Sequence, residues 1–77
     1  MTVFIQLKLF AGLAALAPPD ARRLAIEPAD SVRSVLDRLG IPTAKAHLIF
    51  IDGVKRSLDT PLSGGERVGI FPPVAGG

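Results

Sequence analysis

One short segment has the apolar spacing of an α-helix that buries a single face, and it constrains the fold more than any other feature. Its branched apolar side chains stand at positions i, i+3, i+4 and i+7: Val32, Val35, Leu36 and Leu39. Ser31 precedes them and can cap the helix N-terminus, while Gly40 follows where a left-handed C-terminal cap is favoured. Pro42 prevents continuation. One such helix needs a second layer to cover its apolar face.

The segments on either side of this helix have the period-two pattern of β-strands. In residues 2–10, Val3, Ile5, Leu7 and Leu9 alternate with more polar positions, which predicts a strand with one buried face. The Asp52-Gly53 dipeptide suits a hairpin turn, and Pro72-Pro73 ends the final strand. The remaining strands are predicted at residues 22–27, 47–51, 54–57 and 67–71, with a connection at 11–20 that holds at most a short helical turn and a loop at 58–66.

This order of elements defines an α+β protein in which one helix lies between two hairpins. The first and last strands can then be parallel neighbours at the centre of the sheet. We therefore expect the β-grasp, or ubiquitin-like, fold, with a mixed sheet of four to five strands packed on one main helix. Residues 1–73 are expected to form this domain, and residues 74–77 a flexible Gly-Gly tail.

Composition excludes several classes of function. The chain has 77 residues, no cysteine, nine Lys and Arg against seven Asp and Glu, and a net charge of +2. The basic residues are scattered and no Tyr or Trp accompanies them, which argues against nucleic-acid binding. No apolar run reaches the roughly 18 residues that a membrane span needs, and the alternating N-terminus does not resemble a signal peptide. We expect a cytoplasmic domain with no membrane partner.

The side chains that could carry catalysis are few. His47 is the only histidine and has no cysteine partner, so no metal site is expected, and a surface position at a strand edge is favoured. Residues 63–66 are glycine-rich but lack the lysine and the following helix of a phosphate-binding loop, which favours a turn. The carboxylates all have a turn, cap or surface explanation: Asp30, Asp37, Asp52 and Asp59. No bound cofactor is expected.

The carboxyl-terminal residues are the remaining candidate for chemistry. Gly76 and Gly77 have no Cβ, so a carboxylate on Gly77 would stand on a thread narrow enough to enter a channel in a partner. Pro72-Pro73 stiffens the segment before this thread and directs it away from the last strand. A frayed tail without function is the alternative explanation.

Several motifs together resemble the ubiquitin-like sulfur carriers, which include the small subunit of molybdopterin synthase and the thiamine sulfur carrier protein. They are Lys8-Leu9-Phe10-Ala11, Ser31-Val32, the run from Leu58 to Val68 (LDTPLSGGERV) and the run from Ile70 to Gly77 (IFPPVAGG). The resemblance covers essentially the whole chain. Its Phe-Pro-Pro ending favours the molybdopterin branch.

The resemblance implies a carrier without an active site of its own. A ubiquitin-activating-type enzyme would use Mg-ATP to adenylate Gly77, and sulfur from a sulfurtransferase or cysteine desulfurase would convert it to a thiocarboxylate. A larger synthase subunit would then receive the sulfur. Gly76 and Gly77 would form the reactive terminus. Partner contacts would map to Phe10, Phe71, Pro72, Pro73, Val74 and Ala75, with Val54 as a further candidate; partial core burial is the alternative for the two phenylalanines.

Two departures from the family pattern keep the pathway open. The connection after Gly40 is short, and Lys55 stands where related molybdopterin-type carriers often present an apolar contact. Sulfur transfer to thiamine, cysteine, tRNA or a tungsten cofactor therefore remains an alternative. So do conjugation to proteins as a ubiquitin-like modifier and a non-covalent β-grasp interaction module.

Overall fold

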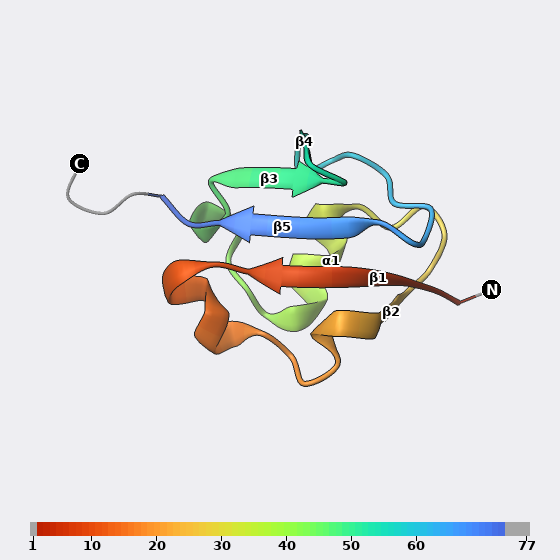
Figure 1. Cartoon of the computed structure of the whole chain (residues 1–77), viewed down its shortest axis with the longest axis horizontal. Helices are drawn as coiled ribbons and strands as arrows, with labels where there is room; N and C mark the ends of the chain where they lie inside the picture. Colours follow the sequence, from red (N-terminus) through yellow and green to blue (C-terminus); the bar gives the residue numbers. More distant parts are fainter. Residues whose placement is uncertain (1, 74–77) are drawn as a thin grey trace.

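The parallel pairing of the first and last strands sets the architecture of the chain. The computed structural model describes residues 2–73. Its strands are β1 (Val3–Leu9), β2 (Leu24–Ile26), β3 (Leu48–Ile51), β4 (Val54–Lys55) and β5 (Arg67–Phe71), and its α-helix is α1 (Val32–Leu39). They form one sheet in the order β2-β1-β5-β3-β4, with β1 and β5 parallel and the other pairs antiparallel (Figure 1). The predicted arrangement is confirmed.

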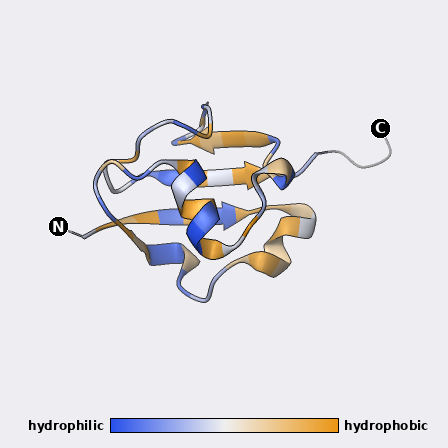
Figure 2. Cartoon of the chain, turned by 180° about the vertical axis from the view of Figure 1, so that it is seen from behind, coloured by the Kyte–Doolittle hydropathy of each residue, from blue (hydrophilic) through white to orange (hydrophobic). Residues whose placement is uncertain are grey.

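One face of the sheet is buried under α1 and the other is open (Figures 1 and 2). On β1, Ile5, Leu7 and Leu9 are buried, whereas Gln6 and Lys8 between them are exposed. Val68 and Ile70 of β5 and Ile49 and Ile51 of β3 complete the buried face of the sheet. The period-two pattern therefore identified the core-facing side chains correctly, because successive residues of a strand point to opposite faces.

The helix begins and ends where its capping residues predict. The Ser34 N–H donates to the Ser31 hydroxyl at 3.2 Å, and the Ser31 N–H donates to the Ser34 hydroxyl at 2.9 Å. Gly40 closes the helix with φ of 75°. Val32, Val35 and Leu36 are buried against the sheet, and burial of each such side chain contributes about 1.5–3 kcal/mol. Leu39 is half-buried at the edge of this core.

The hairpin between β3 and β4 has the predicted turn but a shorter return strand. Asp52 and Gly53 have φ of 53° and 82°, the left-handed conformations of a tight hairpin turn. The predicted strand at residues 54–57 is limited to Val54–Lys55. Just beyond it, the Thr60 N–H donates to the Ser57 carbonyl oxygen at 3.2 Å, which closes a turn at residues 57–60.

Three short 3-10 helices fill connections that the sequence left largely undefined: η1 (Ala11–Leu16), η2 (Ala21–Arg23) and η3 (Thr43–Lys45). η1 agrees with the short helical turn expected before the prolines. η2 takes up the start of the strand predicted at residues 22–27, so β2 begins only at Leu24. Leu13 of η1 is buried, which ties this connection to the core.

Residues 63–66 form a tight turn that a carboxylate holds closed. Both oxygens of Glu66 accept backbone N–H groups at 2.7 Å, one from Ser63 and one from Gly64. The Gly65 N–H donates to the Phe4 carbonyl oxygen at 2.6 Å, which fastens the turn to β1. The predicted turn is thus confirmed, and its Gly-rich sequence has a structural role.

We expect Gly64→Ala to destabilise the protein by about 1–3 kcal/mol. Gly64 has φ of +113°, and an added Cβ would lie 2.8 Å from the Cβ of Val3. Gly65→Ala is the matched control, because Gly65 also has a positive φ, +84°, but nothing lies within 4 Å of its added Cβ. Chemical denaturation should show a larger loss for Gly64→Ala; equal losses would mean that the contact with Val3 costs nothing.

The Glu66 turn also predicts a dependence of stability on pH. Burial raises the pKa of Glu66, but hydrogen bonds from the Ser63 and Gly64 N–H groups more than offset this, so its pKa lies below the ordinary 4.5. A carboxylate with a lowered folded-state pKa stabilises the fold above its unfolded-state pKa, and this stabilisation is lost as the pH falls through the folded-state pKa.

Glu66→Gln should therefore lower the free energy of unfolding at neutral pH by about 1 kcal/mol. The difference in stability between the variant and the unchanged protein should become smaller as the pH falls below 4.5, the ordinary pKa of a glutamate. Thermal unfolding of both proteins over an acidic pH series measures this difference. A gap that stays constant from neutral to strongly acidic pH would show that the carboxylate charge does not hold the turn.

Candidate functional site

The last strand is held on both sides until the chain leaves the sheet. The His47 N–H donates to the Phe71 carbonyl oxygen at 2.8 Å, and the Phe10 N–H donates to the Ile70 carbonyl oxygen at 3.1 Å. β5 therefore fixes the point at which residue 72 departs. Two predicted partner-binding residues follow it, Pro72 half-buried and Pro73 exposed.

Four of the predicted site residues lie outside the described residues: Val74, Ala75, Gly76 and Gly77. The predicted tail, residues 74–77, consists of these same four residues, so the structure does not describe it. The candidate site in the described part of the chain is therefore the surface around the end of β5.

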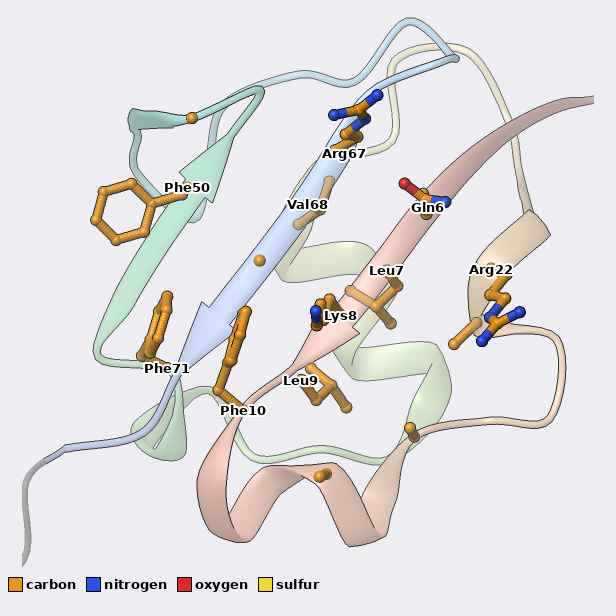
Figure 3. A pocket seen from close by; sticks show the side chains of 15 residues that line it. Gln6, Leu7, Lys8, Leu9, Phe10, Arg22, Phe50, Arg67, Val68 and Phe71 are labelled. Carbon is orange, nitrogen blue, oxygen red and sulfur yellow. The ribbon is translucent and has the colours of Figure 1, made fainter.

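An aromatic cluster of Phe10, Phe50 and Phe71 lies on the open face of the sheet beside the end of β5 (Figure 3). The rings of Phe10 and Phe71 stack with centroids 4.1 Å apart and an angle of 4° between their planes. Phe50 meets Phe71 edge to face at 5.7 Å and 83°. All three side chains are half-buried on the face opposite α1, so Phe10 and Phe71 are not part of the core.

A glycine makes room for this cluster. Gly69 of β5 pairs with Lys8 of β1 and with Phe50 of β3, and a Cβ added to it would lie 3.2 Å from Cε2 of Phe10. The sequence analysis placed Phe10 and Phe71 on outward-facing strand positions but did not group Phe50 with them. The alternation of β3 could have identified Phe50, because its neighbours Ile49 and Ile51 point inward.

Beside the aromatic cluster the open face is hollowed into a groove lined by residues of β1 and β5 and of the stretch from η1 to η2 (Figure 3). From this stretch come the small side chains of Ala14, Ala17 and Ala21. Its polar side chains are Gln6, Lys8, Arg22 and Arg67. The site thus combines an apolar contact at the end of β5 with a rim that carries positive charge.

Val54 does not belong to this surface, contrary to its interpretation as a further contact. It is 51% exposed but pairs with Ile51, whose side chain faces the core, whereas Lys55 pairs with Phe50. Cross-strand partners share a face of the sheet, so Lys55 is on the open face and Val54 on the other. Its predicted place beside Phe10 and Phe71 was wrong because position 54 lies across the two-residue turn from Ile51.

A second, smaller hollow lies where the chain leaves β5. It is lined by Ala11, Gly12, His47, Leu48, Phe71, Pro72 and Pro73. His47 is exposed and directly precedes β3, which agrees with its predicted surface position at a strand edge. Its backbone N–H donates to the end of β5. The hollow places a mainly apolar surface directly under the first residues that follow the strand.

The carboxylates have the structural explanations that the sequence analysis gave them. The Glu27 N–H lowers the pKa of Asp30, which also pairs with Arg38 at 2.6 Å. Asp59 pairs with Arg33 at 2.8 Å, and this guanidinium lowers its pKa. Asp52 accepts the Arg67 N–H at 2.9 Å. Within residues 2–73, no three side chains of His, Asp or Glu gather where they could hold a metal ion.

Across residues 2–73, no helix is both long and apolar enough to cross a membrane.

Archaeal proteins are among the solved structures with the same fold. Small archaeal modifier protein 1 of Haloferax volcanii shares 23% identity with a TM-score of 0.67, covering 96% of this chain and 99% of that one. The HVO 2177 protein of the same organism shares 22% identity with a TM-score of 0.73, covering 99% and 88%. A candidate molybdopterin converting factor, subunit 1, from Pyrococcus furiosus shares 24% identity with a TM-score of 0.61, covering 94% and 99%.

A five-stranded mixed sheet with central parallel strands and one covering helix defines the β-grasp class of ubiquitin-like proteins. The ThiS family profile matches residues 7–77. The chain belongs to the ThiS family of ubiquitin-like sulfur carriers. No curated protein matches it in a sequence search.

Proposed function

We propose that this protein carries sulfur as a thiocarboxylate on Gly77 and donates it in molybdopterin biosynthesis, as the small subunit of the synthase. The observation that carries the proposal is the run Phe71-Pro72-Pro73 at the end of β5, followed by Val-Ala-Gly-Gly in a sequence that matches the ThiS family through residue 77. The fold holds β5 firmly, and the proposed chemistry takes place beyond it.

The proposed reaction needs activation because a carboxylate is a poor electrophile. An adenylating enzyme would attach the Gly77 carboxylate to the α-phosphorus of Mg-ATP, with release of pyrophosphate. A persulfide sulfur would then attack the carbonyl carbon and displace AMP. Cleavage of the remaining S–S bond by a thiol reductant would leave the thiocarboxylate. The enzyme, not this chain, would supply the electrostatic stabilisation of each transition state.

The partners proposed are therefore three. A ubiquitin-activating-type enzyme would adenylate the terminus, a sulfurtransferase or cysteine desulfurase would provide sulfur, and a larger synthase subunit would accept it. We propose that these proteins dock on the aromatic cluster and on Pro72-Pro73. Support comes from the position of the cluster, since Phe71 immediately precedes the residues that an enzyme must reach.

Intact mass spectrometry tests the proposal. The chain is incubated with the adenylating enzyme of its host, Mg-ATP and a sulfur donor, and the expected product has one oxygen replaced by sulfur. Omission of ATP should abolish the exchange. If the complete mixture leaves the mass unchanged although the enzyme forms adenylate on another carrier, the proposed function is wrong.

A second candidate function is conjugation to proteins, because one of the similar structures is a small archaeal modifier protein. The same activated Gly77 would then form an isopeptide bond with lysines of target proteins. Ladders of covalent conjugates on denaturing gels of host extracts would favour this function if they disappear when Gly77 is deleted. Sulfur delivery to a large synthase subunit without such ladders would favour the carrier alone.

A further inference from the structure

The groove beside the aromatic cluster is positively charged. Lys8 of β1, Arg22 of η2 and Arg67 of β5 stand at its rim, and among the described residues that line it none is acidic (Figure 3). Lys8 and Arg67 come from the two central strands, on the face opposite α1. A binding partner on this face meets these cations as well as the phenylalanine rings.

The cations of α1 are arranged differently. The two ion pairs found in residues 2–73 both involve this helix: Arg33 with Asp59 and Arg38 with Asp30. Each cation of α1 thus has its carboxylate within the chain. The three cations at the rim of the groove have no such pair within the described residues, so their charge is available to another molecule.

The arrangement of the phenylalanine rings adds to the preference of this face for negatively charged groups. Phe10 and Phe71 stack on one another face to face, and the Lys8 ammonium lies 5.3 Å from the centre of the Phe10 ring. The rings thus direct their edges outward, and the edge of an aromatic ring carries partial positive charge. Carboxylate and carbonyl oxygens on a partner complement both the ring edges and the cations.

We propose that the surface which the adenylating enzyme presents to this face is acidic, with carboxylates placed against Lys8, Arg22 and Arg67 around an apolar contact on the aromatic cluster. The identity of the partner rests on the proposed function; the acidic chemistry of its surface rests on the groove. The charges steer the encounter, and the ring contact at the end of β5 positions the segment that the enzyme acts on.

Two other occupants fit the groove less well. Single-stranded nucleic acid binds by stacking bases on accessible ring faces, and here Phe10 and Phe71 occupy a face of each other. A second copy of the chain would bring the same cations opposite one another if it docked face to face, which is unfavourable. Both occupants remain outcomes of the test.

The test measures association of the full chain with the adenylating enzyme of its host, without ATP, by stopped-flow fluorescence at low and high salt. We expect Lys8→Glu and Arg67→Glu each to lower the association rate constant about ten-fold at low salt, and high salt to reduce the difference. Lys45→Glu makes the same charge change on η3, which packs against α1 and does not line the groove, and it should change the rate little.

Thermal unfolding of each variant confirms that it is folded, and Lys8→Gln removes the charge without reversing it. Equal rates for all the variants, or equal losses for Lys45→Glu and Lys8→Glu, would overturn the proposal. The proposal would also be overturned if the chain bound a single-stranded oligonucleotide, or associated with itself in sedimentation, and Lys8→Glu abolished that binding without affecting association with the enzyme.

The outcome is separable from that of the proposed function. If Gly77 is thiocarboxylated and the charge reversals leave association unchanged, the acidic surface is wrong and the carrier function stands. If the charge reversals slow association but no sulfur is transferred, the docking surface stands and the carrier function is wrong. If the enzyme neither binds the chain nor modifies it, both are overturned.

Discussion

A variant with one alanine added after Gly77 is expected to lose thiocarboxylation completely while its stability changes by less than about 0.5 kcal/mol. The added residue moves the carboxyl group away from the diglycine and places a Cβ where the thread must be narrow. Among residues 2–73, the buried apolar side chains all lie between Ile5 and Ile70, so the addition removes none of them from the core. Intact mass after the activation reaction and the midpoint of chemical denaturation measure the two effects.

An alanine inserted between Met1 and Thr2 is the matched control, because it changes length and mass equally at a position far from Gly77 in the sequence. It should leave both thiocarboxylation and stability unaltered. Sulfur transfer to the chain extended after Gly77 would show that the reactive group is elsewhere. A large loss of stability would show that the terminal residues pack against the domain.

Leu36→Ala is expected to have the opposite effect, a loss of about 2–5 kcal/mol in the free energy of unfolding. Leu36 is 0% exposed on the face of α1 that covers the sheet. Truncation leaves a cavity that the rigid sheet beneath it can fill only in part. At a temperature where the variant remains folded, its thiocarboxylation should equal that of the unchanged protein, since Leu36 is on the side of the sheet away from the aromatic cluster.

Leu16→Ala removes the same atoms from a side chain that is 44% exposed, and it should cost far less. Urea denaturation of both variants gives the comparison. Similar losses at the two positions would mean that α1 is not packed as the structure describes. A folded Leu36→Ala variant that is no longer thiocarboxylated would mean that the helix itself contributes to partner recognition.

Local patterns predicted the elements that form the core. The alternation in β1, the spacing of Val32 to Leu39 and the caps Ser31 and Gly40 each determine structure over a few residues, so they could be recognised in the sequence alone. The pairing of β1 with β5 followed from the order of elements, because few arrangements bury a single helix face.

Features that depend on distant contacts were not predictable. η2 takes up the first residues of the strand predicted at residues 22–27, and β4 ends at Lys55, two residues short of its predicted end. In the site, the role of Gly69 follows only once β1 and β3 are known to flank it. The groove likewise joins cations from β1, η2 and β5 that are far apart in the sequence. The sequence did not indicate this groove, because its basic residues are scattered along the chain singly or in pairs.

Fragmentation of the intact protein in a mass spectrometer, after reaction with the host adenylating enzyme, Mg-ATP and a sulfur donor, tests the central claim most directly. Sulfur transfer through Gly77 predicts that every fragment containing the last residue is heavier by the exchange of oxygen for sulfur, and that no other fragment is. Sulfur on an internal fragment, or none on Gly77 under conditions in which the enzyme hydrolyses ATP in response to this chain, would contradict it.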